Sequence, residues 1–227
     1  MIITIDGPSG AGKSTVSRGL AKLLSFTYLD TGAMYRAVAL AVYRAGAEIK
    51  DHEKLNEICS SVDIRFEGDF DSPHIIMNGE DVSEAIRTPV MDMQASLVSA
   101  VPLVREKMTL FQRLTGEKGD IVAEGRDMGT VVFPDADIKF FLTASIAARV
   151  ERRYQERSAK GKKISKEDIE KDILQRDKQD SSREIAPLAA AKDAIYIDSS
   201  EINAEEVINL MLYKIKNTSV LRRTITD

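Results

Sequence analysis

The chain has 227 residues, enough for one core domain and a smaller appended one. Its net charge of −4 argues against general nucleic-acid binding, and its single cysteine, Cys59, excludes an intramolecular disulfide and a cysteine-based zinc cluster. The longest apolar run, residues 37–42, is far too short for a membrane span. The first residues already belong to a strand, so we expect no signal peptide. These features predict a cytoplasmic globular protein with neither nucleic-acid nor membrane partners.

The start of the chain carries a phosphate-binding motif. Residues 2–6 are a β-branched run typical of a buried strand, and Val16, Leu20 and Leu23 repeat at helical spacing after it. Between them, residues 7–14 match G-x-x-x-x-G-K-[ST], the P-loop. A glycine-rich turn that happens to contain Lys-Ser is the alternative, but the strand and the helix in register argue against it. We expect this stretch to bind ATP through Gly7, Pro8, Ser9, Gly10, Ala11, Gly12, Lys13, Ser14 and Thr15.

The next elements predict an α/β fold with an insert. Residues 27–30 indicate a second strand and residues 33–44 a helix, and this alternation is typical of a parallel sheet with ligands at the strands' carboxyl ends. After a helix over residues 52–62, the stretches 63–67 and 74–77 alternate as short antiparallel strands joined by a turn at 68–73. We expect a small β-rich subdomain here, followed by helices that begin at Pro89 and Pro102.

The α/β pattern resumes in the second half of the chain. Strands are predicted at 121–124, 138–142 and 194–198, which makes five core strands. Residues 145–183 are highly charged and helical, with a basic break at 160–163 and a helix cap at Ser165, and this indicates a mobile lid. A final helix follows Asn203, and the tail from Thr218 has little periodicity.

Arginines recur where the strands and helices would face a phosphate site. Each cluster has a plain alternative as a solvated salt-bridge surface, but phosphoryl transfer needs fixed cations, and the planar arginine side chain binds phosphate bidentately. A GTPase is disfavoured, because the nearest match to a guanine-reading Asn/Thr-Lys-x-Asp motif, residues 165–168, lies in the charged helical region. Of the arginines that crowd the start of the lid, we expect Arg153 and Arg157 to contact ATP.

Four motifs together resemble a known family. GPSGAGKS at 7–14, DTGAMYR at 30–36, EGRDMGTVVFPDA at 124–136 and the run from Arg176 to Leu188 are similar to bacterial cytidylate kinases. The resemblance extends from Ile2 to about Asn217. It implies a P-loop three-layer α/β fold with a five-stranded parallel core sheet, a β-containing CMP-binding insert and a helical lid. It also implies a nucleoside monophosphate kinase acting on CMP and dCMP.

The resemblance assigns the acceptor residues motif by motif. Ser96, Arg105 and Asp127 would hold cytosine, and a carboxylate such as Asp127 suits the amino donor of that base. Without the family, Ser96 would be taken for an ordinary helix-surface serine. Two mild departures, Thr31 in place of Ser and Glu124 in place of Asp, leave the choice between CMP and dCMP open. The remaining CMP-binding assignments are Arg36, Arg126 and Arg183 at the phosphate, Arg176 with Asp180 at the sugar, and Thr31.

The resulting prediction is a cytidylate kinase that uses ATP and Mg²⁺. Lys13, Arg126 and Arg183 are the predicted catalytic residues, Ser14 is the predicted metal ligand, and the protein is expected to be a monomer. A kinase for another small acceptor, such as UMP or shikimate, and a non-enzymatic ATP switch are the alternatives. The predicted division of the chain is 1–61 core, 62–118 CMP-binding insert and connecting helices, 119–144 core, 145–183 lid, 184–217 core and 218–227 tail.

Overall fold

The computed structural model describes residues 1–70, 73–159, 161 and 164–218. The chain divides into two units, the first formed by residues 1–29 with the chain from 119 onward, and the second by residues 30–118. The finer six-part division made from the sequence remains a prediction. Three predicted features fall wholly or largely outside the described residues: the middle of the turn at 68–73, most of the basic break at 160–163, and the tail beyond Thr218.

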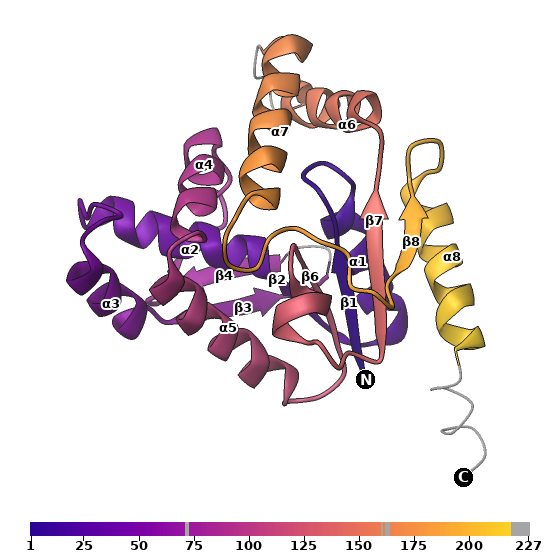
Figure 1. Cartoon of the computed structure of the whole chain (residues 1–227), viewed down its shortest axis with the longest axis horizontal. Coiled ribbons are helices and arrows are strands. Elements are labelled where there is room, and N and C mark those ends of the chain that lie inside the picture. The colour runs from indigo at the N-terminus through magenta and orange to yellow at the C-terminus, as the bar shows by residue number, and fades with distance from the viewer. Residues whose placement is uncertain (71–72, 160, 162–163, 219–227) are drawn as a thin grey trace. The chain divides into compact units, whose positions relative to one another are not determined.

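The first unit is built on a parallel sheet with β1 at its centre (Figure 1). β1 pairs with β6 on one side and with β7 on the other, and β7 pairs with β8, all in parallel. Ile3, Ile5 and Phe140 are completely or almost completely buried, as expected of strands covered on both faces. The predicted five-stranded parallel sheet is thus confirmed. Its strands, in spatial order, are β2 (Thr27–Asp30), β6 (Ile121–Gly125), β1 (Ile2–Asp6), β7 (Ile138–Thr143) and β8 (Ile195–Asp198).

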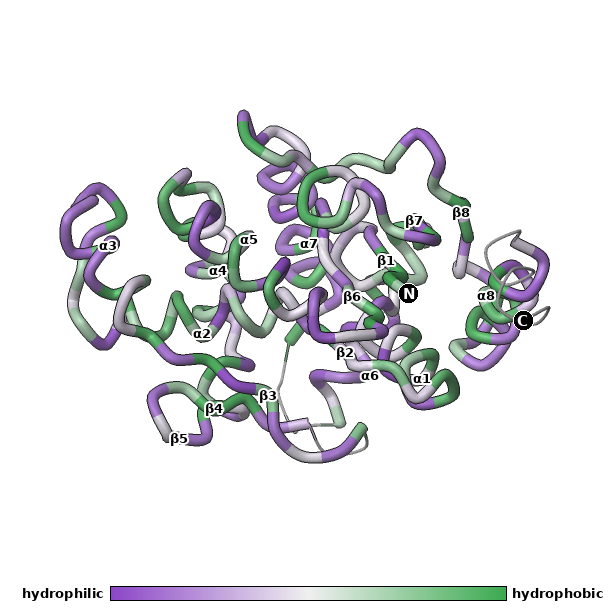
Figure 2. The backbone as a smooth tube through the Cα atoms, turned by 90° about the horizontal axis from the view of Figure 1, so that it is seen from below, coloured by the Kyte–Doolittle hydropathy of each residue, from purple (hydrophilic) through white to green (hydrophobic). Residues whose placement is uncertain are grey.

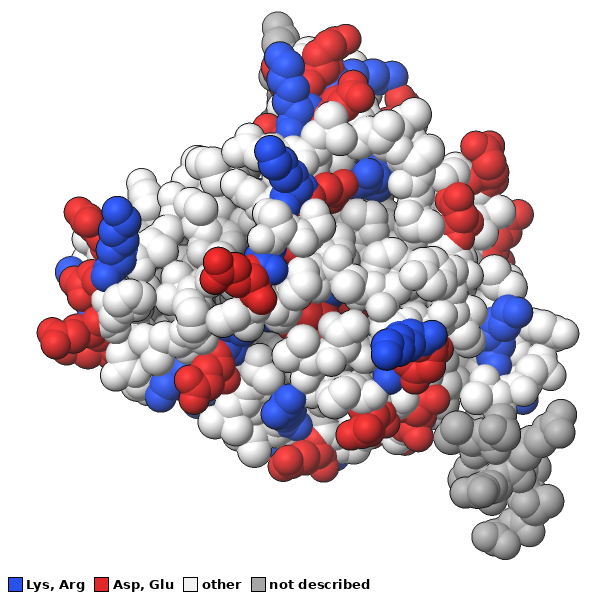
Figure 3. Space-filling view, in the orientation of Figure 1, with Lys and Arg blue, Asp and Glu red and all other residues white. Residues whose placement is uncertain are grey.

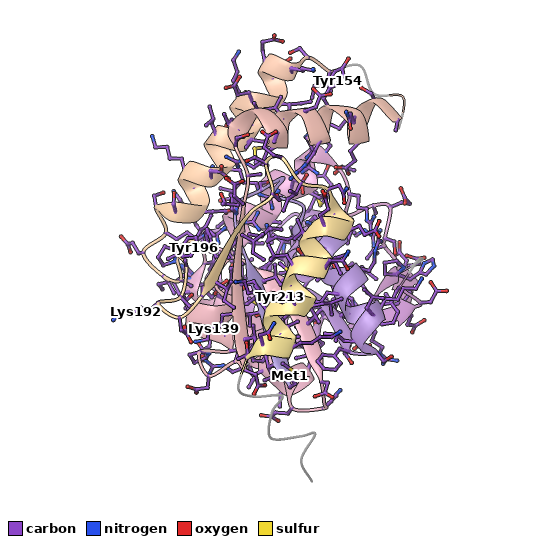
Figure 4. The ribbon with its side chains drawn as sticks, turned by 90° about the vertical axis from the view of Figure 1, so that its right-hand side faces the viewer. Met1, Lys139, Tyr154, Lys192, Tyr196 and Tyr213 are labelled. Carbon is purple, nitrogen blue, oxygen red and sulfur yellow. The ribbon has the colours of Figure 1, made fainter. Side chains whose placement is uncertain are left out.

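Two helices flank this sheet. α1 (Lys13–Leu24) packs against β6 and against α8 (Ala204–Asn217). The approach is close, since a Cβ at Gly19 would lie 2.6 Å from the Ile208 Cδ1 atom. A complete capping box starts α8, in which the Asn203 side chain accepts from the Glu206 N–H and the Glu206 carboxylate accepts from the Asn203 N–H. Figure 4 shows Tyr213 of α8 and Tyr196 of β8, whose side chains are largely exposed.

α6 (Ile146–Ala159) and α7 (Lys166–Ser181) follow β7 and lie beyond its carboxyl end (Figure 1). A small apolar cluster of Val150, Ile169 and Ile173 joins them, and Tyr154 packs at its edge. Most other residues of α7 are hydrophilic (Figure 2). The predicted cap at Ser165 is confirmed, because its hydroxyl oxygen accepts from the Asp168 N–H at 3.1 Å. Among the described residues, every helix is too short or too polar to cross a lipid bilayer.

The second unit contains four helices and a small antiparallel sheet in the described part of the chain. The central helix is α2, which packs against α4, α3, α5 and β4 around Met34, Val38 and Leu55. Within the sheet, β4 is largely hydrophobic and β5 hydrophilic (Figure 2), and Arg44 binds Glu80 bidentately at 2.6 and 2.8 Å. The predicted β-containing insert is confirmed. The elements are α2 (Thr31–Arg44), α3 (His52–Ser61), β3 (Ile64–Gly68), β4 (Pro73–Met77), β5 (Glu80–Asp81), α4 (Pro89–Val98) and α5 (Pro102–Gly116).

Candidate active site

The P-loop, residues 7–14, turns the chain from β1 into α1. Gly7 has φ 153°, and a Cβ there would lie 1.9 Å from the Leu142 carbonyl oxygen, so no other residue fits. Gly12 has φ 92° and precedes the first helical residue, Lys13, without offering a side-chain cap. The N–H groups at the start of α1, together with the positive end of its dipole, therefore form a site for an anion.

Lys13 is buried beneath this loop. Its ammonium group donates to the Pro8 carbonyl oxygen at 2.8 Å, and its exposed fraction is 6%. Burial, and next the positive charge of Arg126, lower the pKa of Lys13 to about 7. The negative charge of a bound polyphosphate would oppose both influences, because it favours the charged form of Lys13.

A cluster of cations surrounds one buried carboxylate, Asp180 of α7. Arg126 donates to it through Nε at 2.7 Å and Arg183 through Nη2 at 2.5 Å. Burial raises the pKa of Asp180, but the attraction of these arginines outweighs burial and holds that pKa below its ordinary value. The Arg126 pKa is raised, since Asp180 outweighs the burial of the guanidinium. The cations in electrostatic contact with Asp180 are Lys13, Arg126, Arg176 and Arg183. Glu124 and Asp177 also act on Lys13 or Arg126, so the cluster is a buried network of cations and carboxylates whose arginines suit phosphate.

The segment after β6 places Asp127 close to β1. Asp127 is 2% exposed, and its carbonyl oxygen accepts from the N–H groups of Val131 and Val132 in a π-helical turn, η1 (Met128–Val132). Glu124, at the end of β6, accepts from the Tyr28 hydroxyl at 2.5 Å. Such π-turns are frequent at functional sites.

The arginines of α6 have different surroundings. Arg149 donates to the Ser9 carbonyl oxygen at 3.1 Å and to Asp177, and Arg152 donates to the Ala11 carbonyl oxygen at 3.4 Å. Of the two arginines predicted to bind ATP, Arg153 pairs with Glu156, and Arg157 pairs with Asp172 of α7. The contacts with the P-loop backbone thus come from Arg149 and Arg152, one helical turn before the predicted pair.

Arg36 is the predicted phosphate-binding residue of the second unit. Its guanidinium lies 3.5 Å from Asp30 and 3.8 Å from Asp92, and its Nε atom has no hydrogen-bond partner among the described residues. A Cβ at Gly32 would lie 3.2 Å from Arg36 Nη1, so the glycine leaves room for the arginine. Thr31, the first residue of α2, directly precedes Gly32 and is buried.

Ser96 and Arg105 are both buried in the second unit. Arg105 of α5 donates to the Ser99 carbonyl oxygen at 3.1 Å, and its guanidinium lies 5.5 Å from the centre of the Tyr35 ring. Ser96 is 6% exposed, which contradicts its alternative interpretation as a surface serine. Polar groups held this deeply are usually placed for a partner.

Comparison with known proteins decides the family. The sequence profile described as cytidylate kinase matches residues 3–217. The cytidylate kinase of Geobacter sp. (strain M21) is 48% identical over 216 residues, covering 95% of this chain and 93% of that protein. The cytidylate kinase of Syntrophotalea carbinolica is 49% identical over 212 residues, covering 93% of this chain and 90% of that protein. The chain belongs to the cytidylate kinase family. The predicted enzyme class, an ATP-dependent nucleoside monophosphate kinase, is confirmed with it.

Solved structures support the fold. The shikimate kinase of Bacteroides thetaiotaomicron superposes with a TM-score of 0.50 at 13% identity, covering 95% of this chain and 98% of that chain. At this identity the likeness concerns the fold alone. It places this cytidylate kinase family member among proteins with the same arrangement of strands and helices.

Sequence reasoning missed three residues around the P-loop of this family member. Arg149 and Arg152 were passed over because the charge pattern of α6 does not tell which face meets the loop. A usable signal existed, since the first turns of a helix that follows a strand beside β1 must lie near the P-loop. The sequence did not reveal that β7 is that neighbour. Asp6, which accepts two hydrogen bonds from the η1 turn, was counted only as part of a strand.

Proposed function

We propose that this chain transfers the γ-phosphoryl group of ATP to CMP or dCMP, giving ADP and CDP or dCDP. The observation that supports this most directly is the cation cluster around Asp180 next to Lys13. Two phosphate chains repel each other, and fixed cations such as the four in this cluster are the means by which a protein brings them together.

The reaction needs charge neutralisation more than proton transfer. The attacking group is an oxygen of the CMP phosphate, which is already ionised, so no general base is required. The new bond forms between that oxygen and the γ-phosphorus, while the bond from the γ-phosphorus to the bridging oxygen of ADP breaks. Lys13, Arg126 and Arg183 stabilise the charge on the transferring group, and the water-excluding lid prevents hydrolysis of ATP.

Magnesium is the expected companion of ATP, and the residues present suit it. Mg²⁺ keeps several waters and takes only one or two protein oxygens besides the phosphates. Ser14, exposed at the start of α1, offers such an oxygen beside the predicted phosphate site. When bound, the metal would neutralise charge on the donor phosphates. The lid arginines Arg149 and Arg152 join Arg153 and Arg157 as candidates for contact with ATP.

Base recognition is assigned to buried polar groups. Asp127 would accept from the cytosine amino group, Arg105 would donate to the ring nitrogen or carbonyl, and Ser96 would add a hydroxyl. Arg36, Arg126 and Arg183 would hold the phosphate, Arg176 with Asp180 the sugar, and Thr31 would line the CMP site. UMP replaces the amino donor by a carbonyl acceptor, so it would set two acceptors against each other in a dry site. Each such mismatch costs roughly 1–3 kcal/mol.

The test is an acceptor screen with coupled ADP detection, run with the wild type and Asp127→Ala. We expect ADP production to depend on CMP, to be weak with UMP and absent with shikimate. Asp127→Ala should lower kcat/KM for CMP more than for UMP, changing their ratio by roughly 5- to 150-fold for the loss of one such interaction. Asp135→Ala, at an exposed carboxylate of the same loop, is the matched control and should leave both unchanged.

Three results would contradict parts of this proposal. Equal losses for CMP and UMP in Asp127→Ala would remove that residue from the base site. Faster turnover of UMP or shikimate than of CMP would mean that CMP is not the acceptor. ATP hydrolysis that does not depend on any acceptor would favour the alternative of a P-loop ATP switch. The cytoplasmic location, the monomeric state and the absence of nucleic-acid partners remain predictions from the sequence.

A further inference from the structure

Asp6 joins the start of the P-loop to the Arg126–Asp127 segment. It is the last residue of β1 and directly precedes Gly7. One carboxylate oxygen accepts from the Met128 N–H at 2.9 Å and the other from the Gly129 N–H at 2.8 Å. Asp6 is 3% exposed, so both bonds lie away from water. The two donors immediately follow Asp127, so their position fixes where that residue stands.

The backbone around Gly129 is packed too closely against its neighbours to shift. A Cβ at Gly129 would lie 2.9 Å from the Thr4 hydroxyl oxygen and 3.2 Å from Lys139 Cδ. The side chain of Lys139, on β7 (Figure 4), is itself held by the Pro134 carbonyl oxygen and Asp193. The two N–H groups are therefore held between β1 and β7.

This carboxylate is placed at an electrostatic disadvantage. Burial, opposed by the hydrogen bonds from Gly129 and Met128, raises the pKa of Asp6 to about 6, with a further rise from Asp127 and a reduction from Lys13. A protonated carboxyl or an amide has only one good acceptor for these two donors, whereas the ionised carboxylate has two. The arrangement thus uses the ionised form in a place where burial disfavours it.

We propose that Asp6 is a positioning residue for the acceptor nucleotide, acting through the Met128 and Gly129 N–H groups to hold Arg126 and Asp127 in register with the P-loop. The inference rests on the proposed function, since it assumes that Arg126 and Asp127 meet CMP. Asp6 itself touches neither nucleotide. Its loss should therefore affect the acceptor and leave the donor site intact.

The main test is Asp6→Asn, which keeps the shape but turns one acceptor into a donor facing an N–H. We expect KM for CMP to rise roughly tenfold or more, because small displacements of positioning groups have large effects. The preference for CMP over UMP should narrow at the same time. The dissociation constant for ATP, measured by fluorescence titration, should change much less than KM for CMP, because Asp6 acts on the P-loop only through its charge near Lys13.

A second pair of variants displaces the same segment without touching Asp6. Gly129→Ala inserts a methyl group against the Thr4 hydroxyl and should raise KM for CMP in the same way. Adding Thr4→Ala removes that hydroxyl and should recover part of the loss. The matched control is Asp137→Asn, because Asp137 also accepts a backbone N–H from β1, that of Ile2 at 2.6 Å, at the opposite end of the strand. It should leave KM for CMP unchanged.

A pH series separates positioning from general support of the fold. The phosphate of CMP titrates near pH 6 in both proteins, so substrate protonation cancels in the ratio of wild type to Asp6→Asn. As pH falls from 8 to 5, Lys13, whose pKa is about 7, gains a proton in both proteins, whereas Asp6 becomes protonated in the wild type alone. The ratio of kcat/KM for CMP should therefore decrease toward one.

Unchanged KM and unchanged CMP preference in Asp6→Asn would overturn the inference. So would a parallel loss of CMP and ATP affinity, which would indicate general damage. If Asp6→Asn does not fold, the Gly129→Ala variant and its rescue decide the matter on the same readouts. A wild type that makes no ADP with CMP would overturn the proposed function and this inference together. An active wild type beside an unaffected Asp6→Asn would overturn the inference alone.

Discussion

The Asp180 cluster and the outer faces of α6 and α7 use the same kinds of side chain in opposite ways. Asp180 binds two arginines with 2% of its side chain exposed. On the lid helices, Lys166 pairs with Glu151 at 2.5 Å while about half of each side chain remains in water. Figure 3 shows positive and negative side chains intermixed over these helices. The distances between nitrogen and oxygen are similar in the two groups of ion pairs. The groups differ in how far water reaches their side chains.

This difference indicates which charges serve the reaction. Water screens an exposed ion pair and hydrates both side chains when the pair breaks, so such pairs contribute little to the stability of the fold. In the buried cluster neither compensation is available, so loss of one partner leaves a buried charge without its counter-ion. α6 and α7 are held together instead by the Val150, Ile169 and Ile173 cluster. Four predictions follow the comparison, from the buried cations outward.

The largest loss should come from Lys13→Ala. Removing a buried cation at the phosphate site should reduce kcat by roughly a hundred- to a thousandfold, as for other groups that stabilise transition-state charge. The fold should survive, because burial and Arg126 already disfavour the charged lysine. Since its pKa is lowered to about 7, the unfolded chain binds more protons above that pH. Wild-type stability should therefore rise from pH 7 toward 10, and the variant should lack this rise. Near-normal turnover in a folded Lys13→Ala protein would contradict the assignment of the P-loop.

Asp180→Asn should rank second, with losses in both stability and activity. Two arginines would lose their shared carboxylate, which typically lowers the free energy of unfolding by about 3–5 kcal/mol. Because the folded-state pKa of Asp180 is depressed, its stabilisation is present above the ordinary value of 3.8 and is lost as pH falls through the folded pKa. Urea unfolding at pH 7 and in acid should show the difference between wild type and variant shrinking in acid. A difference independent of pH would contradict the charge argument.

A smaller and more local effect is expected from Ile169→Ala. Ile169 is completely buried between α6 and α7, and such truncations cost about 2–5 kcal/mol. Hydrogen exchange should accelerate across both helices, and KM for ATP should rise. In the wild type, exchange there should slow when both nucleotides bind, as expected of a lid. Leu174→Ala, at a half-exposed position of α7, is the matched control. If hydrogen-exchange rates in α6 and α7 change neither with the mutation nor with bound nucleotides, these helices are static scaffold.

Lys166→Ala should have the smallest effect. Its partner Glu151 remains hydrated after the change, so the melting temperature should shift by no more than about 2 °C and turnover should stay unchanged. Calorimetry and the coupled assay measure both. A loss comparable to that of Asp180→Asn would mean that solvent access does not distinguish the two groups of ion pairs.

Periodicity and one motif were sufficient to predict most of the fold. The β-branched run before Gly7 identifies a strand, and the apolar pattern after Ala33 identifies a helix. In both elements the burial of side chains follows the sequence pattern directly. Helix α2 begins at Thr31, two residues before the predicted start, because the Asp30 carboxylate caps it by accepting from the Ala33 N–H at 2.8 Å. A cap depends on side-chain direction, which the hydrophobic pattern does not contain.

The site was predicted less completely. Lys13, Arg126 and Asp180 lie close together, as the motifs suggested, and Ser96 and Arg105 are buried in their own unit. The roles of Asp6, Arg149 and Arg152 depend on contacts between residues more than a hundred positions apart. Those contacts follow from the order of strands in the sheet, and local sequence does not determine that order.

The central position of β1 also has a consequence for how the chain folds during synthesis. β1 is made well before its neighbours, because β6 and β7 are separated from it by more than half the chain. Its apolar residues therefore stay unpaired until residue 125 has left the ribosome, and paired on one side alone until residue 143 has followed, at roughly 5–20 residues per second. The second unit, residues 30–118, is continuous and has its own core, so it can fold in the meantime. Arg183, one of the predicted catalytic residues, is made later still, so these residues come together only after most of the chain has been synthesised. Until β6 emerges, the Ile-Ile-Thr-Ile stretch of β1 is an unpaired apolar strand that is prone to aggregation.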